Sequence, residues 1–133
     1  MPALAAFTDA WSPRLLSILR IVSGFIFLLH GAQKLLGFPA PFPMPVTLFS
    51  MIGVAGLLEL FGGALVMIGL FSRPVAFILS GEMAFAYFIG HAPKAFWPVL
   101  NGGDAAILYC FVFLYIAAAG PGPWSVDRWR NAP

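Results

Sequence analysis

A few ionisable residues interrupt the long apolar stretches of this 133-residue sequence. Glu59 and Glu82 each lie near the middle of such a stretch, and Arg20 lies inside another one. A charged side chain at the centre of a bilayer is costly unless it is neutralised, paired or hydrated. Carboxyl groups in such a place can take up and release protons, and they can also hold a polar ligand. These residues are therefore candidates for a site for a polar head group, a proton or an ion.

Further polar residues cluster toward the end of the first apolar stretch, namely His30, Gln33 and Lys34. The least costly arrangement turns all these groups toward the inside of a helical bundle and pairs them. Arg20 with Glu82, or His30 with Glu59, is an example of such a pair. A structural alternative stays open, in which the ions serve to fix the register and topology of the helices.

Small residues surround these polar positions at helical spacing. Positions three or four residues away from Glu59 are all small: Ala55, Gly56, Gly62 and Gly63. Gly24 and Gly31 lie on the same helical stripe as Arg20 and Lys34. Small residues let helix backbones approach closely in lipid. The sequence therefore predicts that the polar groups lie on packing faces, which could serve contacts within one chain or within a homo-oligomer.

No motif for self-contained catalysis is present. His30 and His91 are predicted near the same membrane face, but no paired histidine or E-x-x-H motif accompanies them, so no metal site is predicted. The sequence lacks a G-x-S-x-G elbow, a P-loop and a dinucleotide fingerprint. The lone Cys110 cannot form an internal disulfide or a CxxC pair. The sequence thus predicts no intrinsic cofactor, and it leaves open whether the chain is an enzyme.

Four apolar stretches must position these residues. They cover about 13–36, 46–71, 74–91 and 104–120, and a polar tail follows at 121–133. Prolines and glycines separate the stretches and prevent one continuous helix. Because a membrane helix needs about 20 apolar residues, four spans nearly fill the chain. The sequence predicts an all-α integral membrane protein with a single domain, 1–133, that is a bundle of four transmembrane helices.

Composition supports the lipid environment. Hydrophobic residues make up 61% and charged residues 9% of the chain, whereas a soluble domain is about 25% charged. The apolar stretches are continuous and too long for barrel strands. The basic residues are scattered, so a nucleic-acid partner is excluded.

The basic residues also predict an orientation. With four spans, both termini and the middle turn share one side of the membrane. That side carries most of the basic residues, namely Arg14, Arg73, Arg128 and Arg130, and the other side carries Lys34 and Lys94. By the positive-inside rule, both termini are predicted to lie in the cytoplasm.

Three segments resemble the DoxX family. LRIVSGFIFLLHGAQKLLGFP, residues 19–39, is similar to the family's first helix with its HGxxKLxG-like segment. GLLELFGGALVMIGLFSRPVA, residues 56–76, is similar to the second helix with its embedded Glu and G-L-x-x-R turn. GPGPWSVDRW, residues 120–129, resembles the terminal GPG-x-[YW]-S-x-D signature. The resemblance covers nearly the whole chain, with one departure at Asp104, where the family more usually has Glu.

The resemblance implies a four-helix protein of the bacterial inner membrane. Relatives include a membrane subunit of a thiosulfate:quinone oxidoreductase, and others are linked to thiol and oxidative-stress complexes. His30, Lys34 and Glu59 match the family's polar signature and become candidates for a quinone head-group site. Glu82, Arg20 and Gln33 join them as candidates from their positions in the sequence. The chain has no group that carries two electrons. The electrons would therefore come from a soluble or membrane redox partner, or from a bound substrate.

Two other functions remain open at this stage. A small proton-coupled transporter would use Glu59 and Glu82 as a titrating pair. A non-catalytic scaffold for a soluble oxidoreductase would use Arg128, Trp129 and Arg130 as a docking tail. The basic residues of that tail also suit orientation and lipid contact.

Overall fold

A computed structural model describes residues 1–131, so the last two residues of the predicted tail lie outside the described part. Every regular element of these residues is helical. The α-helices are α1 (Pro2–Leu36), α2 (Met51–Leu57), α3 (Gly63–Ile68), α4 (Ser72–Ala86), α5 (Pro98–Asn101), α6 (Asp104–Ala119) and α7 (Val126–Arg130). Two π-helical segments, η1 (Leu58–Gly62) and η2 (Tyr87–His91), and the 3₁₀ turn η3 (Ala92–Lys94) continue them. The predicted all-α class is confirmed.

Three helical runs are long and apolar enough to cross a membrane, namely Pro2–Leu36, Met51–Ile68 and Ser72–Lys94. The fourth apolar helix, α6, has 16 residues. At about 1.5 Å per residue it is somewhat shorter than a hydrocarbon core of about 30 Å. The structure thus supports membrane-spanning helices, and the four-span topology with cytoplasmic termini stays a prediction.

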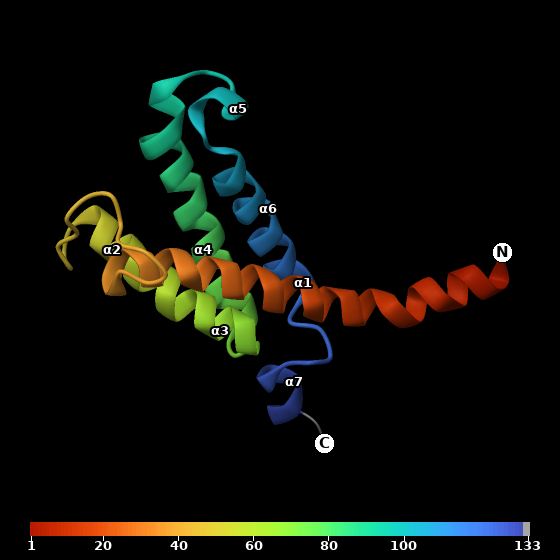
Figure 1. The fold of residues 1–133 in the computed structure, drawn as a ribbon. Helices are drawn as coiled ribbons and strands as arrows, with labels where there is room; N and C mark the ends of the chain where they lie inside the picture. Colours follow the sequence, from red (N-terminus) through yellow and green to blue (C-terminus); the bar gives the residue numbers. More distant parts are fainter. Residues whose placement is uncertain (132–133) are drawn as a thin grey trace.

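The first helix begins earlier than the predicted span 13–36. It starts at Pro2 and continues through Pro13. Residues 2–12 are rich in Ala, the strongest helix former. All residues from 1 to 15 are exposed, and Figure 1 shows this part of α1 projecting away from the other helices. The helix propensity of these residues therefore extends α1 beyond the part that packs against the other helices.

Capping residues lie at both ends of the second helical run. The Ser50 side chain accepts a hydrogen bond of 3.1 Å from Gly53 N–H, which starts the helix at Met51 instead of near residue 46. Gly69 has a φ of 75°, the left-handed conformation that ends α3. Between these ends, η1 interrupts the α-helix and contains Glu59. Such π-helical segments are frequent at functional sites.

The helices pack in two pairs. α1 packs along α2, η1 and α3, whereas α4 packs along α6. Figure 1 shows the two pairs running at a steep angle to each other. They meet where α4 approaches η1 and α3, and where α1 approaches α6. The buried core lies at this meeting point, with Phe27, Val66, Leu79 and Phe113 at most 1% exposed.

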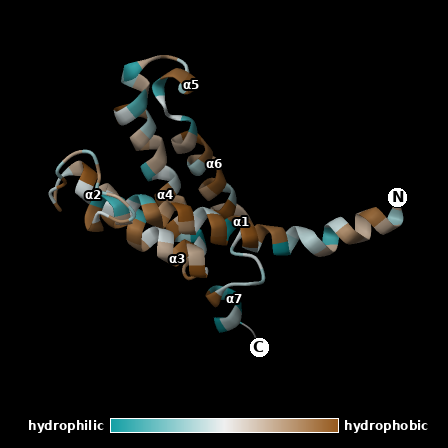
Figure 2. Cartoon of the chain, viewed as in Figure 1, coloured by the Kyte–Doolittle hydropathy of each residue, from teal (hydrophilic) through white to brown (hydrophobic). Residues whose placement is uncertain are grey.

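Glycines bring α1 close to the second helical run. A Cβ atom at Gly31 would lie 2.3 Å from the backbone nitrogen of Leu60, and one at Gly24 would lie 2.6 Å from that of Met67. At these distances there is no room for a side chain on α1. The stripe of small residues therefore forms a close helix–helix contact, as predicted. Many large apolar side chains instead remain exposed, and Figure 2 shows how much of the helical ribbon consists of hydrophobic residues, drawn in brown. This is the pattern expected for helices that face lipid.

Candidate functional site

A cavity of about 750 Å³ lies between the two helix pairs. α1, α2, η1, α4, η2 and α6 all contribute to its wall. The ionisable residues that line it are His30, Lys34, Glu59, Glu82, His91, Lys94 and Tyr109. Four of the six site residues predicted from the sequence are thus brought together, while Gln33 and Arg20 do not line this cavity. The cavity is the candidate functional site.

Lys34 and Glu59 form an ion pair in the cavity wall. The Lys34 Nζ donates a hydrogen bond of 2.5 Å to Glu59 Oε2, and their side chains are 15% and 5% exposed. The predicted pairing of Glu59 with His30 is therefore wrong. At Gly56 a Cβ atom would lie 3.1 Å from the Cβ atom of Lys34, so the absence of a side chain lets the Lys34 stem run along the helix toward Glu59.

Glu82 has a different environment in the same cavity. Both of its carboxyl oxygens are buried, and neither has a hydrogen-bond partner among residues 1–131. The predicted pair with Arg20 is therefore absent from the described structure. A buried polar group without a partner is costly, and a carboxyl group can either accept or, when protonated, donate a hydrogen bond. Glu82 is thus suited to contact a polar group of a ligand in this cavity.

Aromatic rings form one wall beside these polar groups. The rings of His30 and Tyr109 lie edge to face with centroids 6.1 Å apart. Tyr109 in turn packs against Phe27 at 5.1 Å and Phe113 at 5.7 Å. This packing holds the partly exposed Tyr109 ring in place beside the imidazole of His30 in the cavity wall.

The end of α4 brings a second histidine to the cavity. The π-helical η2 ends at His91, whose Nδ1 lies 3.1 Å from the carbonyl oxygen of Asn101. Because a carbonyl oxygen accepts, Nδ1 of His91 is the donor in this hydrogen bond. Asn101 is 3% exposed and is itself held by a hydrogen bond of 3.0 Å to the Ala95 carbonyl. Sequence analysis weighed His91 as a metal ligand and did not include it among the ligand-site residues.

The remaining wall of the cavity is apolar and partly exposed. Exposed apolar side chains that line it include Val54, Leu58, Ile78, Phe85 and Ile89. In a bilayer such side chains contact lipid tails. The cavity therefore combines buried polar groups with a side that faces the hydrocarbon, and it suits an amphipathic ligand that enters from lipid.

Arg20 lies outside the cavity and contacts the end of α3 and the tail. It is fully buried and donates hydrogen bonds to backbone carbonyls, with Nε to Pro121 (2.7 Å), Nη1 to Val66 (2.7 Å) and Met67 (2.6 Å), and Nη2 to Trp124. The carbonyls of Val66 and Met67 belong to the last turn of α3, and that of Val66 also accepts a hydrogen bond of 3.1 Å from the Gly69 N–H group that caps this helix. Arg20 therefore holds the end of α3 and the tail against α1.

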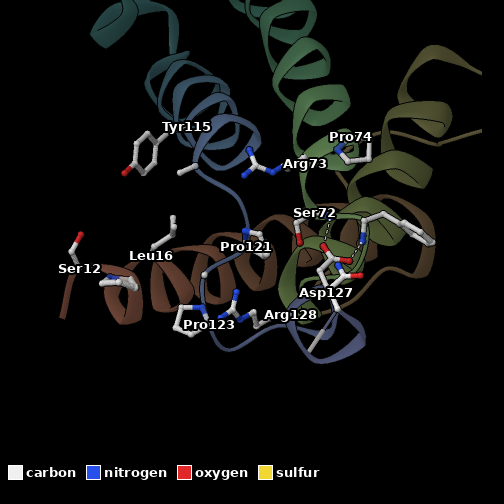
Figure 3. Close-up of a pocket in the computed structure, with 15 residues that line it drawn as sticks. Ser12, Leu16, Ser72, Arg73, Pro74, Tyr115, Pro121, Pro123, Asp127 and Arg128 are labelled. Atoms are coloured by element: carbon white, nitrogen blue, oxygen red, sulfur yellow. Dashed lines mark hydrogen bonds between the residues drawn. The ribbon is translucent and has the colours of Figure 1, made fainter. Parts of the chain in front are cut away.

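Asp127 fixes the tail from the other side. Its carboxylate accepts hydrogen bonds from the backbone N–H groups of Phe71 (2.9 Å) and Ser72 (2.8 Å), at the start of α4 (Figure 3). Partial burial opposes ionisation, but the hydrogen bonds from Ser72 and Phe71 outweigh it and hold the pKa of Asp127 below its usual value. Phe71 has a φ of 51°, a strained conformation that this contact supports. The terminal signature is thus a structural clamp, which sequence analysis missed.

Comparison with known proteins supports the resemblance seen in the sequence. The sequence model of the DoxX family matches residues 15–92. An uncharacterised protein of Haemophilus influenzae is 41% identical over 125 residues, which cover 90% of this chain and 93% of that protein. Inner membrane protein YphA of Escherichia coli is 29% identical, covering 87% of this chain and 90% of that protein.

A further relative is an uncharacterised membrane protein of Mycobacterium tuberculosis, 26% identical over 96% of this chain and 88% of its own length. No solved structure matches the chain. The family model covers more than half of the sequence, and the relatives align with nearly all of it. Together with its long apolar helices, these matches show that the chain is a membrane protein that belongs to the DoxX family.

Proposed function

We propose that this protein is a quinone-binding membrane subunit that takes part in sulfur, thiol or oxidative-stress redox chemistry with a partner protein. The observation that carries the proposal is the cavity of about 750 Å³, which joins buried polar groups to an apolar side facing lipid. A quinone has the matching character, with two carbonyl oxygens on a flat ring and a long hydrocarbon tail. Such a ligand reaches the cavity through the bilayer.

The polar groups can contact both quinone oxygens. Ammonium and imidazole N–H groups donate hydrogen bonds to carbonyl oxygens, and Lys34 and His30 lie on one wall. Glu82 lies on another wall and, when protonated, is also a donor. The flat ring fits against the partly exposed ring of Tyr109, while the tail extends past the exposed apolar side chains of α4.

The carboxyl groups suit the proton balance of quinone reduction. Conversion of a quinone to a quinol takes up two electrons and two protons. Glu59 and Glu82 line the cavity and are able to pass protons to the reduced oxygens. In this proposal the electrons come from a partner protein or a bound substrate.

The proposal includes a membrane orientation. α6 completes a fourth span, and both termini face the cytoplasm of a bacterial inner membrane. The support is that Asp127 joins the tail to the α3–α4 turn and Arg73 joins the start of α4 to the end of α6, both at one end of these helices, whereas Lys34 and Lys94 line the cavity toward the other end. A relative is named as an inner membrane protein, which agrees with this location.

The test is thermal unfolding of the detergent-purified full chain with a series of quinones that differ in ring and tail. One quinone class is expected to raise the unfolding temperature saturably in the wild type. Glu82→Met is expected to fold and to lose most of this shift, because Glu82 has no protein partner to lose. Gln33→Met is the matched control, since it makes a similar change outside the cavity.

No quinone shift in the wild type would overturn the proposal, as would an equal loss of the shift in both variants. Proton uptake by vesicles that contain the protein, in the absence of any quinone effect, would instead favour the transporter. A partner protein that binds the chain without a quinone effect, and is lost when the tail is cut before Asp127, would favour the scaffold.

A further inference from the structure

A second cavity, of about 810 Å³, lies at the opposite end of the helices from Lys34 and Lys94. Its walls come from α1, the start of α4, the end of α6 and the tail that leads to α7. Figure 3 shows Arg73 and Arg128 on either side of Pro121 in this region, with Tyr115 on the facing helix α6. None of these residues belongs to the candidate quinone site.

The guanidinium groups at this cavity retain unused donors. Arg73 uses Nη1 for the carbonyls of Ala117 (3.1 Å) and Ala118, and its Nε and Nη2 have no hydrogen-bond partner among residues 1–131. The side chain of Arg128 makes no hydrogen bond within the same residues, and Arg128 is exposed. Both groups can therefore accept an anion without breaking an internal contact.

The neighbouring carboxylate of Asp127 does not neutralise these arginines through an ion pair. Asp127 lines the same cavity, but its two oxygens accept hydrogen bonds from the backbone N–H groups of Phe71 and Ser72. No ion pair joins Asp127 to Arg73 or Arg128 within the described residues. The cavity therefore keeps a positive character from two guanidinium groups that come from different helices.

We propose that this cavity binds the phosphate of an anionic phospholipid head group between Arg73 and Arg128. Guanidinium groups match phosphate oxygens in charge and geometry, and basic pockets between membrane helices bind anionic head groups. The hydroxyl groups of Tyr115 and Ser12 line the same cavity and are further donors to the head group.

The surroundings favour a lipid over a soluble phosphate. Leu16, Phe71 and Pro74 line the cavity beside the arginines, and the exposed apolar side chains Phe111 and Leu114 continue along α6. Acyl chains can lie on this surface while the phosphate stays at the helix ends. Exposed tryptophans near the same end, Trp11, Trp124 and Trp129, are typical of the head-group level of a membrane.

Native mass spectrometry of the detergent-solubilised full chain tests this proposal. The protein is titrated with phosphatidylglycerol and with phosphatidylcholine of the same acyl chains, so that only the head group differs. We expect the wild type to retain the anionic lipid preferentially. Arg128→Gln is expected to weaken that binding about tenfold, because a charge-assisted hydrogen bond to phosphate is lost.

Arg14→Gln is the matched control, because Arg14 is an exposed arginine of the same end that does not line the cavity. It is expected to keep the wild-type affinity. An equal loss in both variants, or equal retention of the two lipids by the wild type, would overturn the proposal. So would competition by millimolar inorganic phosphate that removes the lipid preference completely, since the site would then recognise a soluble anion.

The circular dichroism spectrum of Arg128→Gln, recorded on the same sample, must match that of the wild type. Binding of the anionic lipid is independent of quinone binding, because the two cavities share no residue. Failure of one proposal therefore leaves the other unaffected.

Discussion

The Lys34 ammonium lies 2.5 Å from the Glu59 carboxylate, across the contact between α1 and η1. This pair neutralises two charges within the apolar part of the protein and fixes the polar end of the cavity. Glu82 lines the same cavity without a partner in the described residues. The site thus combines an ion pair, which joins α1 to η1, with a carboxyl group that has no partner among the described residues.

Removing one partner of the Lys34–Glu59 ion pair should destabilise the protein more than removing both partners. Lys34→Met leaves Glu59 buried without its partner and is expected to cost about 3 kcal/mol, whereas Lys34→Met with Glu59→Leu should cost much less. Thermal unfolding of both single variants and the double variant measures this difference. Additive losses from the two single changes would contradict the pairing.

The close helix contact at Gly31 should not tolerate a side chain. Gly31→Ala places a Cβ atom against the backbone of Leu60, at 2.3 Å, and should lower the free energy of unfolding by about 1–3 kcal/mol. Gly81→Ala is the matched control, because no atom lies within 4 Å of the added Cβ atom. It should leave stability unchanged or raise it by up to about 1 kcal/mol. Equal effects in unfolding experiments would argue against the packing.

Arg20 should be a structural residue. Arg20→Met removes the arginine donor from carbonyl groups of α3 and the tail, among them those of Met67 and Pro121, and is expected to lower the free energy of unfolding by about 3 kcal/mol. Limited proteolysis should then cut within the tail, near residues 121–131, before the helices are cut. The exposed Arg14→Met should change stability by less than about 0.5 kcal/mol. A tail that stays protected in Arg20→Met would contradict this role.

The Asp127 clamp should depend on pH. Because its pKa is lowered in the folded state, the carboxylate contributes stability above the unfolded value of 3.8. That contribution is lost as the pH falls below 3.8 and through the lower folded value. Asp127→Asn should lower the unfolding temperature at neutral pH, with a cost of about 1 kcal/mol, and the difference should shrink at acidic pH.

The exposed Asp9→Asn variant is the control for this measurement, since Asp9 makes no side-chain hydrogen bond in the described structure. Its unfolding temperature should follow that of the wild type at every pH. A difference between Asp127→Asn and wild type that stays constant down to pH values well below 3.8 would show that ionisation of Asp127 does not support the fold.

Sequence reasoning located the helices and the polar cluster for physical reasons that act locally. Long apolar stretches, prolines and glycines determine where membrane helices run. The cost of burying charge predicts that Lys34, Glu59 and Glu82 turn inward, and the structure places all three in one cavity. The glycine stripe on α1 predicts a close helix contact, and the distances at Gly24 and Gly31 confirm it.

The pairing of the polar groups could not be predicted in the same way. It depends on how the helices are rotated and where they cross, and the sequence does not specify the crossing of the two pairs. Arg20 bonds to backbone carbonyls, which every residue offers, so no sequence pattern singles out its partners. For the same reason the contact from Asp127 to the start of α4 was missed.

The most direct test of the quinone site is photo-cross-linking of the full chain in membranes with a quinone that carries a photoreactive group on its ring. Mass spectrometry then locates the labelled peptides. The proposal predicts saturable labelling of the helical segments that carry Glu59, Glu82 and Tyr109, and an excess of unlabelled quinone should suppress it. Labelling confined to the tail and the N-terminal part of α1, or labelling that unlabelled quinone does not suppress, would contradict a quinone site in this cavity.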